Sequence, residues 1–154
     1  MIVISDTSAI TALLQIGHAD LLEKLFHEIL IPEAVRDELL KSHSSLPVYL
    51  RCEPVRNLAE VKRLLAEIDL GEAEAIALAK ERHADILLID ELKGRRVAER
   101  EGLRFIGLMA VLIQAKDKHF IKSVRDLTAE LERVADFRVS EKIKSAAFRK
   151  AGEL

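Results

Sequence analysis

The sequence predicts an α/β fold with three layers, in which helices cover both faces of a central, mostly parallel sheet of four to five strands. Short apolar runs of the kind that form buried strands recur along the chain, as at residues 2–5 and 86–89. Longer segments with the apolar spacing of helices lie between them. This alternation implies right-handed crossover connections, which make neighbouring strands parallel.

The predicted elements follow in a simple order. Strands are expected at residues 2–5, 28–31, 86–89 and 103–106, with an edge strand at 137–139. Helices are expected at residues 8–16, 19–26, 32–41, 69–82, 91–101, 109–116 and 124–134, and Ser140 caps a last one. Pro32 suits the start of its helix because its missing N–H needs no partner there. Residues 42–58 contain three serines and two prolines and predict a loop, with a short helix near 46–50 as an alternative.

A single domain covering residues 1–154 is expected, with the C-terminal helices from about residue 124 packed on it. The chain is 49% hydrophobic and long enough to bury a core without disulfides. Cys52 is the only cysteine, which fits a reduced compartment. No apolar run approaches the roughly 20 residues of a membrane span. We therefore expect a cytoplasmic protein that does not enter a membrane.

The charges are unevenly distributed, although the formal net charge is only -2. Residues 1–77 carry 7 Lys and Arg against 13 Asp and Glu, whereas residues 78–154 carry 17 against 13. An acidic centre with a basic rim suits a polyanion that Lys and Arg attract and that bound cations meet at its phosphate. The alternative is that these charges only solvate helix faces.

Several kinds of chemistry lack the residues that they need. The chain has no Walker or Rossmann phosphate-binding loop and no H-E-x-x-H zinc motif. Its five histidines are scattered, and Cys52 has no nearby histidine to activate it. The carboxylates therefore remain as the candidates for catalysis.

Two aspartates stand at the ends of predicted strands. Asp6 follows the run Ile2 to Ser5, and Asp90 follows the run Ile86 to Ile89. Ligands of open parallel sheets bind at the carboxyl ends of the strands, so the two acids would share one cleft if their strands are neighbours. A metal site is the leading interpretation.

Glu38 is a further candidate on the helix that begins at Pro32. Val35 and Leu39 lie four residues apart and mark the core side of that helix, so Glu38 falls at the margin of the core face. An ordinary solvated position is the alternative.

Glu72 and Glu74 compete for a third acidic position. Asp69 and Glu72 have the spacing of a capping box, which alone could explain Glu72. Glu72 shares a helical face with Ile76, while Glu74 lies on another side. The facing favours Glu72, although a small rotation of the helix would favour Glu74.

In their order and spacing these segments resemble PIN-domain nucleases, including the VapC-type toxins of prokaryotic toxin–antitoxin pairs. The resemblance covers most of the chain. It is carried by Asp6-Thr7-Ser8, Pro32-x-x-Val35-x-x-Glu38-Leu39, Gly71-Glu72-Ala73-Glu74-Ala75-Ile76, Leu88-Ile89-Asp90 and Gly94-Arg95-Arg96-Val97-Ala98. Many relatives have Asp at the third acidic position and Thr two residues before the fourth, where this chain has Glu72 and Leu88.

The resemblance implies an acidic cluster that binds Mg²⁺ or Mn²⁺ and hydrolyses RNA. The catalytic and metal-binding acids would be Asp6, Glu38, Glu72 and Asp90. We expect Asp6 and Asp90 as direct ligands, with the two glutamates holding metal-bound waters or a second ion. The family further implies an antitoxin protein as a partner and a homodimer.

Four other residues receive expected roles near these acids. Ser8 would orient a ligand or a water, or would simply cap its helix. The basic residues Lys93, Arg95 and Arg96 would bind substrate phosphates, or would be solvated residues of a surface helix.

Two other functions stay open. The protein could be a non-catalytic interaction module that keeps the fold and binds a partner. It could also be a phosphatase with Asp6 as nucleophile, as in haloacid dehalogenase-like enzymes, but such enzymes need a second Asp where this chain has Ser8.

Overall fold

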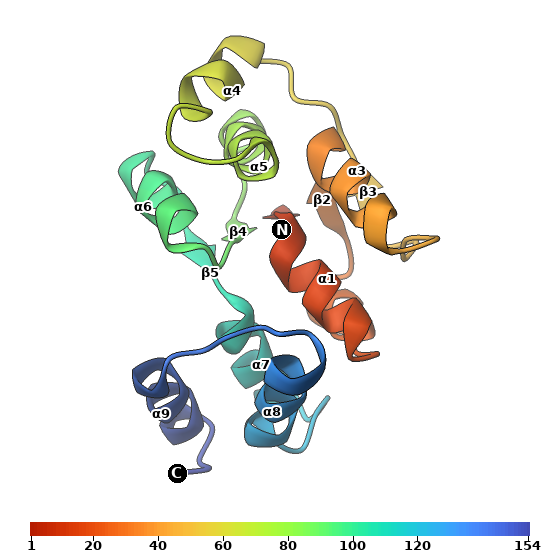
Figure 1. The fold of residues 1–154 in the computed structure, drawn as a ribbon, viewed down its shortest axis with the longest axis vertical. Helices are drawn as coiled ribbons and strands as arrows, with labels where there is room; N and C mark the ends of the chain where they lie inside the picture. Colours follow the sequence, from red (N-terminus) through yellow and green to blue (C-terminus); the bar gives the residue numbers. More distant parts are fainter.

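The computed structural model describes residues 1–154, and its centre is a five-stranded sheet in which every pairing is parallel (Figure 1). The strands are β1 (Val3–Ser5), β2 (Ile29–Ile31), β3 (Leu50–Cys52), β4 (Ile86–Leu88) and β5 (Phe105–Ile106). The helices are α1 (Thr7–Gln15), α2 (Asp20–Phe26), α3 (Glu33–Ser42), α4 (Leu58–Leu64), α5 (Leu70–Glu81), α6 (Leu92–Arg100), α7 (Leu108–Asp117), α8 (Val124–Val134) and α9 (Glu141–Lys150). The predicted α/β class and parallel sheet are confirmed.

The strand order, β3-β2-β1-β4-β5, places β1 at the centre of the sheet. The chain first builds outward on one side of β1 and then returns to add β4 and β5 on the other side. The direction of winding therefore reverses between β1 and β4. In open α/β sheets a crevice forms at this point, outside the carboxyl ends of the strands.

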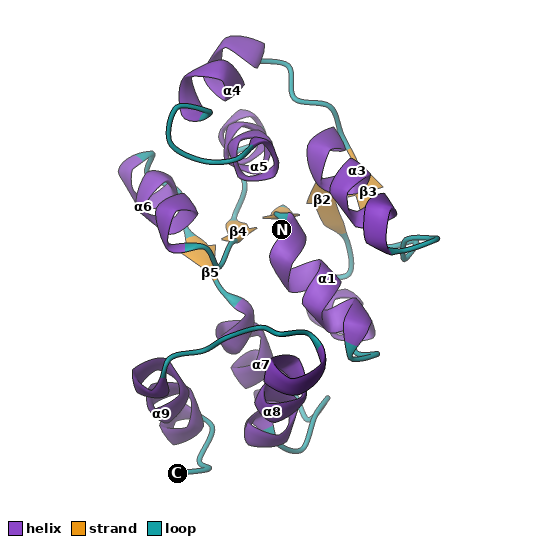
Figure 2. Ribbon diagram, in the orientation of Figure 1, coloured by secondary structure: helices purple, strands orange, loops and turns teal.

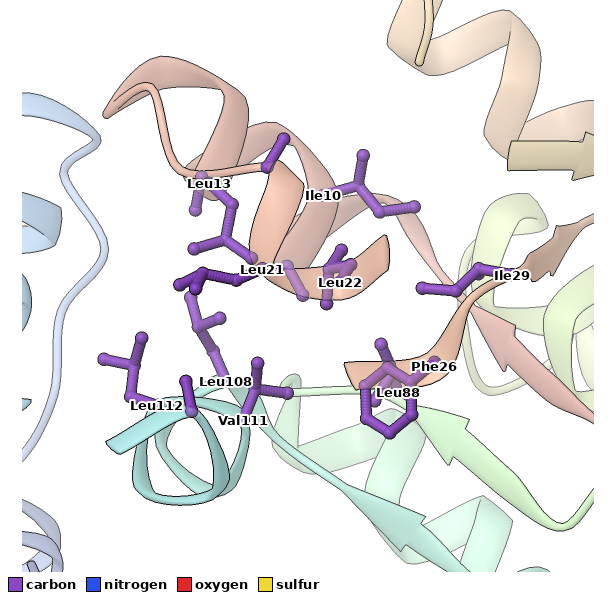
Figure 3. Close-up of a cluster of buried hydrophobic side chains, with 14 of the residues drawn as sticks. Ile10, Leu13, Leu21, Leu22, Phe26, Ile29, Leu88, Leu108, Val111 and Leu112 are labelled. Atoms are coloured by element: carbon purple, nitrogen blue, oxygen red, sulfur yellow. The ribbon is translucent and has the colours of Figure 1, made fainter. Parts of the chain in front are cut away.

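Helices cover both faces of the sheet (Figure 2). Side chains alternate along each strand, so the apolar residues of a buried strand point to both faces. Val3 of β1 belongs to a core cluster with residues of α1, α2, α7, α8 and α9. The next residue, Ile4, belongs to a second cluster with residues of α4, α5 and α6. Figure 3 shows part of the first cluster, where Ile10 and Leu13 of α1 lie near side chains of α2 and α7. The sheet is thus the middle of three layers.

Two parts of the sheet differ from the prediction. Residues 50–52 form β3, where the sequence predicted a loop or a short helix, because they pair in parallel with the buried strand β2. Residues 137–139 are not a strand. Phe137 and Val139 are half-buried and Arg138 is exposed, so their alternation comes from packing against the core cluster and not from strand pairing. Helix α4, capped by Asn57, was not predicted either.

The chain end is fastened to the start of α8 by Glu153. Its carboxylate accepts hydrogen bonds from the backbone N–H groups of Val124 (2.7 Å) and Arg125 (2.9 Å) and from the Ser123 hydroxyl (3.1 Å). Lys116 of α7 adds an ion pair at 2.8 Å. A carboxylate at a helix N-terminus meets unpaired N–H groups and the positive end of the helix dipole. This contact connects α7, α8 and the segment after α9.

None of the helices combines the length and the apolar character that crossing a bilayer would require.

Candidate functional site

Asp6 and Asp90 stand at the carboxyl edge of two neighbouring strands. Ser5 of β1 is in register with Leu88 of β4, and the backbone N–H of Asp6 donates to the Leu88 carbonyl at 3.1 Å. The two acids therefore lie at the crevice where the winding of the sheet reverses. The sequence predicted one shared cleft if the two strands are neighbours, and β1 and β4 are neighbours.

Asp6 is the most deeply buried acid at this edge, with 2% of its surface exposed. Its Oδ1 atom is buried and has no hydrogen-bond partner. Burial, and then the charges of Asp90 and Glu72, raise its pKa well above the ordinary value, against a smaller opposing effect of the Ser8 backbone N–H. A buried carboxylate that is repelled by two others is a costly arrangement unless a cation compensates it.

Asp90 is held in place by its surroundings. The backbone N–H of Leu108, at the start of α7, lies 3.1 Å from Oδ1 and 3.3 Å from Oδ2. The Arg95 guanidinium lies 3.7 Å from Oδ1. Burial raises the pKa of Asp90, while the Leu108 hydrogen bond and Arg95 lower it in part. Both donors fix the direction in which this carboxylate points.

Glu72 has a structural contact and a free oxygen at the same time. It completes the capping box of α5: its N–H donates to Asp69 at 2.8 Å, and its Oε1 accepts from the Asp69 N–H at 3.3 Å. Its Oε2 is buried and has no partner. Burial, followed by the charge of Asp69 and with a contribution from Glu91, raises the pKa of Glu72 to about 7. The capping box uses only one of the two carboxylate oxygens of Glu72.

Glu38 faces the same space from α3. Its Oε2 accepts a hydrogen bond of 2.8 Å from the Thr7 hydroxyl, which fixes α3 to the start of α1. A cavity of about 40 Å³ lies among these groups, and its lining is entirely non-hydrophobic: Asp6, Thr7, Ser8, Glu38, Asp69, Gly71, Glu72 and Glu91. We call it the acidic cavity. Asp90 does not line it but lies on the adjoining side, where Ser8 and Glu91 are shared with a larger groove.

Glu74 does not take part in the acidic cavity. Its Oε1 accepts a hydrogen bond of 3.0 Å from the N–H of Ala34, in the first turn of α3. It therefore satisfies one of the free N–H groups at the start of that helix. Of the two glutamates between which the sequence left a choice, only Glu72 faces the other acids.

Three glycines allow the acids to approach the backbone. A Cβ at Gly71 would stand 2.5 Å from Oε1 of Glu38, and one at Gly94 would stand 2.8 Å from Oε2 of Glu72. A Cβ at Gly107 would meet Oδ1 of Asp90 at 2.5 Å and also the Arg95 guanidinium. Any larger residue at these positions would displace a carboxylate.

The three basic residues of α6 are not equivalent. Lys93 and Arg96 are exposed. Arg95 is half-buried: its Nε donates to the Ile89 carbonyl at 2.9 Å, and its guanidinium lies over the Phe105 ring at 5.6 Å. Arg95 is therefore bound to the protein beside Asp90, while the other two point into solvent.

Several site residues were not found by reading the sequence. Thr7, Asp69 and Glu91 line the acidic cavity, and the Leu108 N–H holds Asp90. Asp69 had been noted only as half of a capping box. None of the three glycines has the positive φ of Gly17, Gly102 and Gly152, so close contacts between segments distant in the chain, and not the local backbone, require glycine at these positions.

The donor set fits a hard divalent cation. All of its groups are oxygens, the type that Mg²⁺ and Mn²⁺ prefer. The two unpartnered oxygens, on Asp6 and Glu72, are buried acceptors that a cation or its waters would satisfy. No three acidic, histidine or cysteine side chains are close enough together to hold an ion between them directly. Bound water would therefore have to complete the contacts of an ion placed here.

Proteins with an open parallel α/β sheet bind their ligands at the switch point, outside the carboxyl ends of the strands. The acids of this chain lie at that point. The family model DUF3368, described as a PIN domain, matches residues 2–153. The chain therefore belongs to the PIN-domain family, which confirms the resemblance seen in the sequence. A comparison with curated proteins found no match. PIN domains are generally nucleases, so the fold and family are those of a nuclease.

Proposed function

We propose that the protein is a metal-dependent endoribonuclease that hydrolyses RNA phosphodiester bonds at the acidic edge of the sheet. One observation carries the proposal: Asp6 and Glu72 each keep a buried carboxylate oxygen without a partner, and both residues line the acidic cavity. Folding stability alone does not favour such atoms, because each costs about 1–3 kcal/mol. A bound cation gives them a function.

Each residue of the site would have a separate role. Asp6 and Asp90 would be the direct ligands of Mg²⁺ or Mn²⁺, and Glu38 and Glu72 would hold its waters. The ion, when bound, would supply an acidified water and offset charge on the phosphate. Thr7 keeps the Glu38 carboxylate in place, and the Leu108 N–H does the same for Asp90. Ser8 lines the acidic cavity, where its hydroxyl would orient a water.

The physiological setting is inferred from the family resemblance. A role as the toxin of a toxin–antitoxin pair would require a separate antitoxin protein that covers this edge. Self-association as a homodimer and a cytoplasmic location belong to the same expectation.

The test compares the wild type with Asp6→Asn and Asp90→Asn on single-stranded and structured RNA, in Mg²⁺, Mn²⁺ or chelator. Glu99→Gln is the matched control, because Glu99 is exposed and remote from the acidic cavity. We expect cutting by the wild type and by Glu99→Gln only with metal, and none by the other two variants. A fluorogenic phosphate monoester tests the phosphatase alternative in the same preparation.

A second readout does not depend on activity. Ligand binding to the folded state raises stability, by about 2.7 kcal/mol at a hundred times the Kd. Mn²⁺ should therefore raise the melting temperature of the wild type and of Glu99→Gln, and raise that of Asp6→Asn much less. RNA cutting that survives chelator, or equal metal effects in all variants, would refute the proposal.

A further inference from the structure

Arg95 is fixed beside Asp90 by three features of the fold. Its Nε donates a hydrogen bond of 2.9 Å to the carbonyl of Ile89, the residue before Asp90. Its guanidinium lies over the Phe105 ring, 5.6 Å from the ring centre. It also fills the space beside Gly107, because a Cβ at that position would overlap Nη2. This long side chain is therefore held in one direction in the folded protein.

The contact between Arg95 and Asp90 is not a hydrogen bond. Nη2 stands 3.7 Å from Oδ1 of Asp90, which is beyond hydrogen-bond distance. The Asp90 oxygens accept from the Leu108 N–H instead. The one hydrogen bond that the Arg95 side chain makes is to Ile89, through Nε. The N–H donors of both terminal nitrogens are therefore unused.

The unused donors are open to solvent next to the acids. Arg95 and Asp90 both line the larger groove, about 720 Å³ in volume, which shares Ser8 and Glu91 with the acidic cavity. The exposed fraction of the Arg95 side chain is 33%, and that of Asp90 is 18%. A phosphate that reaches Asp90 from this groove therefore also meets the guanidinium.

A fixed guanidinium suits the charge that develops during phosphodiester hydrolysis. The water oxygen forms a bond to phosphorus while the P–O bond to the leaving oxygen breaks, and a proton from the water balances the one that the leaving oxygen gains. Negative charge spreads over the non-bridging oxygens in the transition state. Two parallel N–H groups of an arginine match two such oxygens, and donors fixed in advance need no reorganisation. The guanidinium keeps its own proton throughout.

We propose that Arg95 is a catalytic residue whose terminal nitrogens donate to the non-bridging oxygens of the scissile phosphate in the transition state. The inference rests on the proposed function and deepens it, because it separates Arg95 from Lys93 and Arg96, which are exposed and have no fixed direction. Two other roles predict different results. Arg95 could only orient Asp90, or it could only attract RNA by its charge.

The test uses a substitution that keeps the charge. Arg95→Lys retains a cation beside Asp90 and removes the planar pair of donors. Arg104→Lys is the matched control, because Arg104 is exposed and lines neither cavity. Cutting of RNA in Mn²⁺ gives kcat and KM for the wild type and both variants. Thermal melting with and without Mn²⁺ measures metal binding independently of activity.

We expect the kcat of Arg95→Lys to fall about 100-fold, the usual effect of losing one transition-state donor. Its KM should stay within about threefold of the wild type, because a contact made only in the transition state does not bind the substrate. Arg104→Lys should change neither constant. Mn²⁺ should raise the melting temperature of all three proteins equally, since the ligands of the ion are intact.

Arg95→Ala adds a chemical test of the same assignment. It leaves a space between the Ile89 carbonyl, the Phe105 ring and Gly107 that a free guanidinium ion can enter. Guanidinium chloride, at concentrations far below those that unfold the protein, should restore part of the lost kcat. Potassium chloride at the same ionic strength should not.

Three results would overturn this assignment alone, with Asp6→Asn still abolishing cutting. The first is a kcat of Arg95→Lys equal to that of Arg104→Lys. The second is a raised KM with full kcat, which would make Arg95 only an attraction for RNA. The third is a joint loss of kcat and of the Mn²⁺ effect, which would mean that Arg95 acts only through Asp90. A wild type that does not cut, or that cuts in chelator, would refute the proposed function and this inference together.

Discussion

Gly94 lies against the unpartnered oxygen of Glu72: a Cβ at this position would stand 2.8 Å from Oε2 and 2.6 Å from Cδ1 of Ile89. Helix α6 thus approaches α5 at a point where only glycine fits. The absence of a side chain at Gly94 therefore leaves the room that the Glu72 carboxylate occupies.

Gly94→Ala should lower the free energy of unfolding by about 1–3 kcal/mol, the cost of forcing a methyl group into a packed interior. Denaturant unfolding measures it. Ile89→Val removes the Cδ1 contact, so the double variant isolates the clash with Glu72 and should recover only part of the loss. Full recovery would mean that the carboxylate is not touched.

The stability of the metal-free protein should fall as the pH rises. The pKa of Glu72 is raised from 4.5 to about 7, so between these values the folded state binds more protons than the unfolded state. The expected loss is on the order of 1–3 kcal/mol across that range. Urea unfolding of the wild type and of Glu72→Gln measures it, and the variant should show the smaller slope. Equal slopes would contradict the raised pKa.

Glu72 and Glu74 should respond oppositely to substitution. Glu74→Ala removes the acceptor of the Ala34 N–H and should cost about 0.5–2 kcal/mol, while the stabilisation by Mn²⁺ persists. Glu72→Gln should lose much of that stabilisation. Thermal melting with and without Mn²⁺ measures this difference. If Mn²⁺ raised the melting temperature of Glu72→Gln as much as that of the wild type, Glu72 would not belong to the metal site.

Arg95 and Arg96 should also differ. Arg96→Glu changes an exposed charge, so it should weaken RNA binding and flatten its salt dependence without altering stability. Arg95→Glu would place a negative charge beside Asp90 and remove the donor to the Ile89 carbonyl, so it should lower the melting temperature as well. Unchanged RNA binding at low and high salt in both variants would show that α6 does not meet the substrate.

The C-terminal contact should be sensitive to acid. Burial opposes ionisation of Glu153, but hydrogen bonds from Lys116, Arg125, Val124 and Ser123 outweigh it and lower its pKa to about 2. The stabilisation is complete above about pH 4.5 and is lost as the pH falls toward 2. Glu153→Gln should melt roughly 2–6 °C lower at pH 7 and like the wild type near pH 2. A constant difference would mean that the charge is irrelevant.

The sequence predicted the parts of the fold that are buried and locally encoded. Apolar runs gave β1 and β4, and turn and cap residues gave most helices. The edge strand β3 was missed because Leu50–Cys52 is half exposed and carries Arg51 at its centre, so only pairing with β2 makes it a strand. The segment 137–139 shows the opposite error: a strand was predicted there, but its alternation of apolar and polar residues comes from packing against the core.

Within the site, Asp6 and Asp90 could be predicted to lie at one edge because each follows an apolar strand, and Glu72 because it stands in the first turn of a helix. Glu38 has no such signal, because it lies in the second half of α3. The supports of these acids could not be predicted, because the Thr7–Glu38 bond and the glycine contacts join segments far apart in the chain. Only the folded molecule separates Glu72 from Glu74, since the choice depends on how α5 is rotated.

The pairing of Val3–Ser5 with Ile86–Leu88 joins the two ends of a long stretch of polypeptide. During synthesis the first strand leaves the ribosome well before its neighbour exists, so a growing chain holds Asp6 without Asp90 beside it. A truncated or half-made product would therefore lack the paired carboxylates altogether. Whatever this edge of the sheet does begins only after both of these strands have been translated.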